Sequence, residues 1–275
     1  AQDVSGIETV RGFSGAETGG GMMQHFVDDF VVTVGADVRL SELQRVLAPH
    51  RQWLPLDPPG DPTIGELIEQ NLSGPRRFGY GTVRDYLLGI RVRLLNGSEI
   101  RSGGRVVKNV AGYDLGKLFV GARGRLGTVR EATFKLRPLP EAEAVVGAEL
   151  PDWRAVAELL DAIWRAPLMP VVVDVVSPRR VVVGVAGSTE EVAWQKEQLA
   201  ALGLTQPATL DYNRPLPQRA SVAPSRLVTT LSELHAEEFV ARAGNGWIEY
   251  RGGRTLPMPA SAPAWLQARL EAALR

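Results

Sequence analysis

Four glycine-rich or asparagine-rich turns follow one another between residues 71 and 127, separated by short apolar segments. The turns are Asn71-Leu-Ser-Gly-Pro-Arg-Arg, Tyr80-Gly-Thr-Val-Arg-Asp85, Val107-Lys-Asn-Val-Ala-Gly-Tyr-Asp-Leu115 and Gly121-Ala-Arg-Gly-Arg-Leu-Gly127. Each glycine loses conformational entropy on folding, so a core held only by side-chain packing does not favour so many of them. A bare backbone lets N–H groups approach a ligand closely, and the run therefore favours a bound diphosphate or a flat ring.

Composition limits the class of protein. Hydrophobic residues make up 44% of the 275 residues, and 31 basic side chains balance 31 acidic ones. This balance gives no electrostatic signature of nucleic-acid binding, and no apolar run approaches the ~20 residues that span a bilayer. We therefore expect a soluble, cytoplasmic protein of one large or two medium domains, with no nucleic-acid partner and no direct membrane insertion.

The chain contains no cysteine, and its three histidines, His25, His50 and His235, are scattered. Disulfides, cysteine-ligated zinc or iron–sulfur centres and a cysteinyl link to a cofactor are thereby excluded. We predict no metal site.

Periodicity divides the chain near Arg137-Pro-Leu-Pro-Glu141. Before this point we predict strands over residues 30–37 and 127–136, a hairpin across Asn96-Gly97, and a helix that begins with Ser41 as N-cap. After it, a β-α-β-β-α order predicts a small antiparallel sheet with helices on one face. Asp152 is expected to cap the first of these helices, and Ser188 with Glu191 to form a capping box for the second. The predicted apolar face of the first helix is Val156, Leu159, Leu160, Ile163 and Trp164. The predicted domains are residues 1–140 and 141–275.

Two motifs resemble anion sites. The loop Arg11–Gly21 presents N–H groups to a pyrophosphate, with Ser14 and Thr18 as further donors, or it is a flexible loop near the N-terminus. Pro62-Thr-Ile-Gly65 opens a helix whose N-terminus favours an anion, or it is an ordinary capped helix.

Two further motifs favour a ring or a ribose. Tyr80–Asp85 suits contact with adenine or ribose, or it is a turn with a surface ion pair. Gly121–Gly127 allows an aromatic ring to approach the backbone, whereas the P-loop and dinucleotide fingerprints do not fit. Lys108-Asn109 and Tyr113-Asp114 either orient a ring system or form a hydrogen-bonded turn.

Residues 30–141 resemble the FAD-binding domain of the vanillyl-alcohol oxidase/p-cresol methylhydroxylase superfamily, and most of all the E-type FAD-binding subunits of bacterial glycolate oxidases. The likeness is carried by Gln52-Trp-Leu-Pro-Leu-Asp-Pro-Pro, Thr63-Ile-Gly, Asn71-Leu-Ser-Gly-Pro-Arg-Arg, Tyr80-Gly-Thr-Val-Arg-Asp-Tyr-Leu-Leu-Gly, Gly103-Gly-Arg-Val-Val-Lys-Asn-Val-Ala-Gly-Tyr-Asp-Leu and Glu131-Ala-Thr-Phe-Lys-Leu-Arg-Pro.

The resemblance implies an α+β fold, with an FAD-binding domain followed by a smaller α+β cap domain that contains an antiparallel sheet. It implies an FAD-dependent oxidoreductase subunit of a 2-hydroxy-acid dehydrogenase complex of glycolate oxidase type. The implied partners are a second flavin subunit, an iron–sulfur subunit and a small 2-hydroxy acid. FAD is expected to be non-covalent and weakly retained.

The resemblance also implies a set of cofactor-binding residues, which come from the loop 11–21 and from the four turns and their neighbours. They are Gly12, Ser14, Gly15, Pro58, Thr63, Ile64, Gly65, Asn71, Ser73, Gly74, Gly81, Thr82, Asp85, Gly124, Gly127 and Val129. No catalytic residue is assigned. His235 and Arg242 are candidates by residue type only, and a structural role is the alternative for both.

Four features depart from the family pattern. Ala122-Arg123 and Arg125 stand where small hydroxyl and acidic residues are usual, and no Asn-Pro-Gly tail appears near the C-terminus. Only about ten residues precede Arg11, and Glu66 stands where a second glycine follows Thr-Ile-Gly. These departures support an alternative hypothesis, a non-catalytic, flavin-poor paralogue that serves as an assembly scaffold. A flavin domain of a molybdenum hydroxylase or of a cell-wall reductase is a third interpretation, against which the Ser73-Gly-Pro-Arg-Arg77 run argues.

Overall fold

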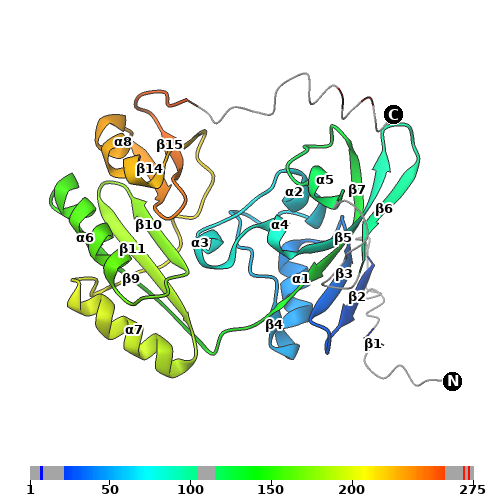
Figure 1. Cartoon of the computed structure of the whole chain (residues 1–275), viewed down its shortest axis with the longest axis horizontal. Helices are drawn as coiled ribbons and strands as arrows, with labels where there is room; N and C mark the ends of the chain where they lie inside the picture. Colours follow the sequence, from blue (N-terminus) through cyan, green and yellow to red (C-terminus); the bar gives the residue numbers. More distant parts are fainter. Residues whose placement is uncertain (1–6, 9–21, 105–114, 258–268, 270–271, 273–275) are drawn as a thin grey trace. The chain divides into compact units, whose positions relative to one another are not determined.

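The computed structural model describes residues 7–8, 22–104, 115–257, 269 and 272, and the chain divides into two compact units. The first contains the chain up to Ser73 and Gly81–Leu139, and the second contains Gly74–Tyr80 and residues 140–257. Each unit combines an antiparallel sheet with helices (Figure 1). The α+β class predicted from the sequence is therefore confirmed.

The first unit is built on a sheet of six strands, in which each neighbouring pair is antiparallel. In spatial order they are β1 (Ile7–Glu8), β2 (Met23–Phe26), β3 (Val31–Gly35), β7 (Gly127–Lys135), β5 (Leu87–Leu94) and β6 (Glu99–Gly103). The other elements are α1 (Leu40–Leu47), η1 (Ala48–His50), the paired strands β4 (Gln52–Trp53) and β8 (Arg137–Pro138), α2 (Ile64–Glu69), α4 (Val83–Tyr86) and α5 (Gly116–Phe119).

One core holds these helices against one face of the sheet. Leu43 of α1 and Leu67 of α2 are fully buried in the same cluster as Phe134 of β7. The predicted cap of α1 is wrong, because the helix begins at Leu40 and Ser41 lies inside it. The amide and hydroxyl of Ser41 instead donate to the carboxylate of Asp61, at 2.9 and 2.8 Å.

The second unit has a seven-stranded antiparallel sheet with three longer helices on one face (Figure 1). Its strands, in spatial order, are β12 (Gln206–Pro207), β9 (Ala142–Glu149), β11 (Arg180–Gly187), β10 (Val172–Val176), β14 (Glu238–Arg242), β15 (Trp247–Arg251) and β13 (Gln218–Ser221). The helical elements are α3 (Arg77–Tyr80), α6 (Trp153–Arg165), α7 (Thr189–Ala201), η2 (Pro224–Arg226) and α8 (Leu227–Leu234).

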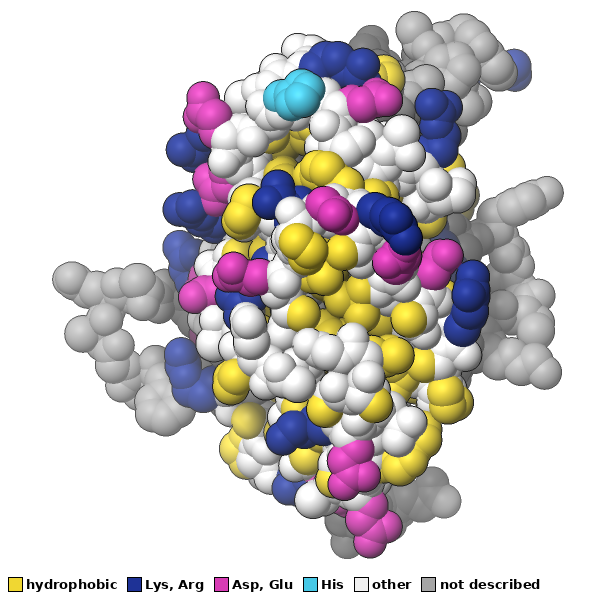
Figure 2. Space-filling view, turned by 90° about the vertical axis from the view of Figure 1, so that its left-hand side faces the viewer, with side chains coloured by type: hydrophobic (Ala, Val, Ile, Leu, Met, Phe, Trp, Pro, Cys, Tyr) yellow, Lys and Arg dark blue, Asp and Glu magenta, His cyan; other side chains and the backbone are white. Residues whose placement is uncertain are grey.

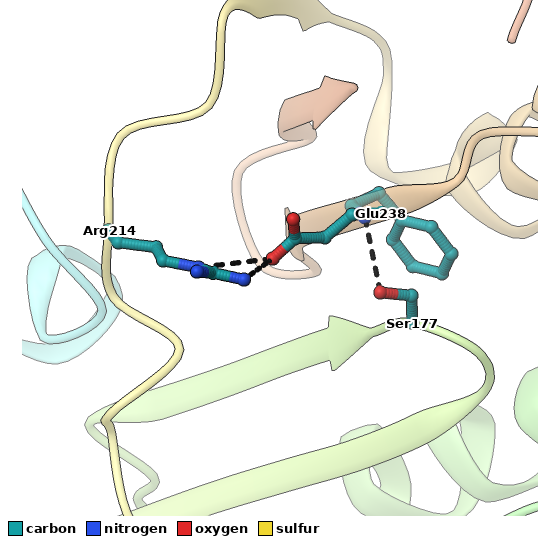
Figure 3. Close-up of polar contacts among 4 residues, drawn as sticks. Ser177, Arg214 and Glu238 are labelled. Carbon is teal, nitrogen blue, oxygen red and sulfur yellow. Dashed lines mark hydrogen bonds and ion pairs between the residues drawn. The ribbon is translucent and has the colours of Figure 1, made fainter. Parts of the chain in front are cut away.

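Residues 208–216 cover the other face of this sheet, where Leu216 packs with Val176 and Val240. Polar contacts fix the segment and the neighbouring turn (Figure 3): Arg214 pairs with Glu238, and the amide of Phe239 donates to the hydroxyl of Ser177 at 3.2 Å. Both faces of the sheet are therefore protected within the second unit itself.

The helical face of the second unit mixes hydrophobic and charged side chains at its surface (Figure 2). On α6 the apolar stripe predicted from the sequence is buried from Val156 to Ile163, but Trp164 is 44% exposed. Among the described residues, no helix is long and apolar enough to cross a membrane.

Candidate functional site

A hollow of about 500 Å³ lies in the first unit, where the turn after β3, the start of α2 and the start of β7 meet. We call it the edge hollow. Its lining residues are Ala36, Asp37, Thr63, Gly65, Glu66, Glu69, Arg91, Thr128, Val129 and Arg130. Three cofactor residues predicted from the sequence, Thr63, Gly65 and Val129, are therefore brought together.

The start of α2 donates all of its first amides within the protein. Thr63 and Glu66 form a reciprocal capping box, in which the Thr63 amide donates to the Glu66 carboxylate at 2.9 Å and the Glu66 amide donates to the Thr63 hydroxyl at 3.2 Å. The amides of Ile64 and Gly65 donate to the carbonyls of Val38 and Ala36. The anion site expected here has no free amide, because the helix start is already capped and docked.

Gly65 and Ile64 have structural reasons for their identity. A Cβ on Gly65 would stand 3.2 Å from the carbonyl oxygen of Ala36, a tight contact that favours glycine where the helix meets the end of β3. The side chain of Ile64 is fully buried in the core. Pro58 is also buried, and it lines neither the edge hollow nor the second hollow described below.

The glycine-rich turn 121–127 closes the other end of α2. The amides of Gly121 and Arg123 donate to the last helical carbonyls, those of Ile68 and Glu69, both at 2.9 Å. Such carbonyls have no partner within a helix, so the turn satisfies them. Gly121 and Gly124 have φ values of +81° and +72°, in the left-handed region that favours glycine.

Glu69 was not predicted from the sequence as a site residue. One of its carboxylate oxygens accepts the amide of Val129 at 3.2 Å, and the side chain lines the edge hollow. Gly127, which was predicted to bind the cofactor, has a structural reason for its identity: a Cβ there would lie 2.5 Å from the carbonyl oxygen of Arg93 in the sheet. No local pattern marks Glu69, since its partner is 60 residues away in the sequence.

Asn71 follows α2 with an unusual combination of features. Its backbone is left-handed, with φ at 52°, and its side-chain Oδ1 is buried without a hydrogen-bond partner among the described residues. Buried polar atoms in folded proteins are nearly always paired, so an unpaired one indicates a ligand or ordered water. Of the neighbouring predicted residues, Ser73 is half-buried and Gly74 is buried.

The turn at Gly81–Asp85 is held by its own carboxylate. Asp85 Oδ2 accepts the Thr82 amide at 2.7 Å and the Thr82 hydroxyl at 2.9 Å. Partial burial raises the pKa of Asp85, but donation by Thr82 together with the charges of Lys135 and Lys117 lowers the pKa more, and the net shift is downward. Of the two carboxylate oxygens, Oδ2 is used in the turn.

A second hollow, of about 480 Å³, lies on strands β2, β3, β5, β6 and β7, and we call it the sheet hollow. Its polar groups include a hydrogen bond of 2.9 Å between the hydroxyls of Thr33 and Thr133 and an ion pair of 3.1 Å between Arg91 and Glu131. Arg91 lines both hollows, and its Nε is buried without a partner in the described part of the chain.

The sheet hollow reaches Met22 and Gly104, which adjoin two segments that lie outside the described residues, 9–21 and 105–114. Gly12, Ser14 and Gly15 of the predicted pyrophosphate loop fall in the first segment, and Lys108-Asn109 and Tyr113-Asp114 fall in the second. No sequence pattern predicted the sheet hollow, because its threonines and charged residues occupy strand positions that ordinarily face water.

Arg242, a candidate by residue type, has a structural role. Its guanidinium pairs with the buried carboxylate of Asp174 on the adjacent strand and donates to Asn213 Oδ1 at 3.0 Å. Burial raises the pKa of Asp174. His235, the other candidate, is exposed at the C-terminus of α8 in a left-handed conformation. No group of three His, Asp or Glu side chains in the described ranges is arranged to hold a metal ion.

The donor set of the first unit fits a flavin dinucleotide in two respects. The two hollows are each of a size that small ligands and cofactors occupy. The unpaired Asn71 Oδ1 and Arg91 Nε supply an acceptor and a cationic donor, while the carboxylates of the edge hollow accept hydrogen bonds from neutral donors.

Comparison with known proteins agrees with this fit. Residues 19–103 match the family model described as FAD binding domain. The chain is 38% identical over 149 residues to glycolate oxidase subunit GlcD of Bacillus subtilis, covering 54% of this chain and 32% of that protein. It is 34% identical over 154 residues to glycolate oxidase subunit GlcE of Escherichia coli, covering 55% and 43%.

A third relative is the mitochondrial D-lactate dehydrogenase [cytochrome] of Arabidopsis thaliana, 32% identical over 133 residues that cover 48% of this chain and 24% of that protein. The chain thus spans less than half the length of these relatives. Among solved structures, alkyldihydroxyacetonephosphate synthase matches with a TM-score of 0.64 at 15% identity, over 90% of this chain and 62% of that one. Residues 19–103 therefore match an FAD-binding domain, the chain is similar in sequence to subunits of bacterial glycolate oxidase, and it shares the fold of alkyldihydroxyacetonephosphate synthase.

Proposed function

We propose that this protein is the FAD-binding subunit of a 2-hydroxy-acid dehydrogenase complex of glycolate oxidase type. In this proposal residues 1–140 form the FAD-binding domain and residues 141–275 the cap. The observation that carries it is the pair of hollows in a domain whose sequence matches FAD-binding proteins. Asn71 Oδ1 and Arg91 Nε, which have no hydrogen-bond partner in the described part of the chain, support it.

The chemistry of the two hollows suggests which residues hold which part of FAD. The edge hollow carries the carboxylates of Asp37, Glu66 and Glu69, which accept hydrogen bonds from hydroxyls and amines and repel anions. It therefore suits the nucleoside end. Arg91, which lines both hollows, suits the diphosphate, as does the loop 11–21 predicted from the sequence.

The sheet hollow suits the flavin end. The backbone of Gly89 and Gly103 lines it, and the hydroxyls of Thr33 and Thr133 lie in the same hollow. FAD supplies the two-electron redox chemistry when bound, and the protein supplies position and electrostatics. The proposed substrate is a small 2-hydroxy acid.

Flavin content tests the proposal directly. Protein purified from a heterologous host and incubated with excess FAD is expected to become yellow after gel filtration and to quench flavin fluorescence with saturation at one FAD per chain. A protein that stays colourless at saturating FAD would reject the proposal in favour of the flavin-free scaffold.

Electron transfer out of the flavin requires a partner. The 275 residues contain no cysteine and offer no thiolate ligand for an iron–sulfur cluster. We propose a multisubunit complex with a second flavin subunit and an iron–sulfur subunit, located in the cytoplasm. Its two glycolate oxidase relatives are themselves named as subunits. Affinity purification from the native host is expected to recover an iron-containing partner, and recovery of the chain alone would contradict this part.

A further inference from the structure

The segment Gly74–Tyr80, which we call the docked segment, belongs to the second unit although the residues on both sides of it belong to the first. It includes α3, and it contains the Gly-Pro-Arg-Arg sequence that is part of the family resemblance. None of its residues lines either hollow. Its contacts therefore have to be explained by something other than direct cofactor binding.

Close packing fixes the end of the docked segment on the second unit. The amide of Gly79 donates to the carbonyl of Val171 at 3.2 Å, and a Cβ on Gly79 would lie 2.6 Å from Val171 Cα. The ring of Phe78 lies against Gly244, where a Cβ would stand 2.0 Å from a ring carbon. The same ring contacts Trp164, with the centroids 5.6 Å apart. Two glycines, one on each side, are thus required for this contact.

An ion pair fixes the beginning of the docked segment. Arg76 donates from Nε to Glu143 Oε1 at 2.8 Å and from Nη2 to Glu143 Oε2 at 2.6 Å. The two side chains are only 18% and 33% exposed. A two-point guanidinium–carboxylate contact of this kind defines orientation as well as distance.

The docked segment is joined directly, at both of its ends, to residues predicted to bind the cofactor. Ser73 precedes it directly, two residues after Asn71 with its unpaired Oδ1, and Gly81 follows it directly and begins the Thr82–Asp85 turn. Since successive Cα atoms are about 3.8 Å apart, displacement of the docked segment by a few ångströms has to move both flanks.

We propose that Arg76, Phe78 and Gly79 are positioning residues for the FAD site, because they anchor the docked segment, which is covalently continuous with Asn71 and Ser73 before it and with Gly81–Asp85 after it. The inference rests on the proposed function, since it presumes that FAD binds the first unit. The Gly-Pro-Arg-Arg sequence then acts by anchoring this segment rather than on the cofactor.

A charge swap tests the proposal. The variants Arg76→Glu and Glu143→Arg are each expected to increase hydrogen exchange in residues 74–80 and to weaken FAD binding, measured by quenching of flavin fluorescence. If undocking reduces the competent fraction to about a tenth, the apparent Kd rises about tenfold. The double variant restores the ion pair with reversed charges and is expected to return the Kd to within about threefold of the parent value.

The matched control is Arg154→Glu, which breaks the Arg154–Glu158 pair on α6, where the side chains are 85% and 64% exposed. It is expected to leave FAD affinity unchanged. Should neither swap variant undock the segment, Gly79→Ala replaces them, because its Cβ overlaps Val171.

An undocked segment with parental FAD affinity, in any of these variants, would overturn the inference. So would a Gly79→Ala protein that is folded by circular dichroism and binds FAD as tightly as the parent. Failure of the proposed function is seen separately, as a parent protein that binds no FAD.

Discussion

Replacing Glu66 with glutamine removes one negative charge from the edge hollow while keeping the size of the side chain. Glu66 is the departure from the family pattern that lines this hollow. In the structure the Glu66 carboxylate caps α2 by accepting the Thr63 amide, and it also lines the edge hollow. Glutamine keeps the capping box, because its amide oxygen accepts the same hydrogen bond. We therefore expect the free energy of unfolding to change by less than about 0.5 kcal/mol.

The expected gain in FAD affinity follows from the size of the hollow. A volume of about 500 Å³ corresponds to a compact space about 8 Å across, and this width sets the scale of separation between Glu66 and a diphosphate at the far side of the hollow. Two unit charges at that distance repel by about 0.5 kcal/mol in water-like surroundings, and a diphosphate carries two. The sum of about 1 kcal/mol predicts roughly fivefold tighter binding by Glu66→Gln.

Titration calorimetry at low salt, with FAD and with adenosine, measures this difference. The gain is expected for FAD only, and it should largely disappear at about 1 M salt, where the Debye length falls to about 3 Å. Glu66→Gly is also expected to bind FAD more tightly, but it loses the cap and adds a helical glycine, at a cost of about 1–2 kcal/mol in stability. Equal FAD affinities for the parent and Glu66→Gln at low salt would refute the electrostatic reasoning.

Three further predictions concern the cofactor link, the glycine turn and the response to acid. Acid precipitation of the loaded protein is expected to release all flavin into the supernatant, because the chain has no cysteine and the loop 11–21 has no histidine to bond it; flavin in the pellet would contradict this. Gly127→Ala is expected to lower the free energy of unfolding by more than about 1 kcal/mol in the apoprotein, because its Cβ would overlap the Arg93 carbonyl; unchanged denaturant midpoints would exclude that clash. The pKa of Asp61 is lowered chiefly by the Ser41 amide, and that of Asp85, despite partial burial, by Thr82 and two lysines. Each ionised carboxylate stabilises the fold at pH values above its ordinary pKa of 3.8, and this stabilisation is lost as the pH falls through the lower pKa of the folded state. At pH values below about 4 the urea midpoint should therefore decrease, and it should decrease less in Asp61→Asn.

Local patterns in the sequence predicted the elements that local interactions determine. The Asn96-Gly97 turn joins β5 and β6 as expected, and Gly97 has a φ of +85°. Asp152 caps α6, and Ser188 forms a capping box with Glu191 at the start of α7. In each case the interacting residues are within four positions of each other, so the local sequence pattern identifies the contact directly.

Long-range contacts could not be predicted in this way. Ser41 has the residue type of a helix cap, but its partner is Asp61, 20 residues along the chain. Trp164 continues the apolar stripe of α6, yet its ring lies at the surface beside Phe78. Neither contact has a periodic signature, because each depends on which segments the fold brings side by side.

The glycines that first suggested a ligand have more than one cause, and the structure separates them. Gly127 is required by the close approach of β5, and Gly121 lies in the turn that closes α2. A glycine explained by a protein contact says nothing further about a cofactor. A buried polar atom with no partner among the described residues is a better indicator, because folded proteins rarely leave such an atom unpaired. The best evidence for the FAD site among the described residues therefore lies at Asn71 and Arg91, and variants at these two positions will report on the cofactor more directly than variants at the glycines.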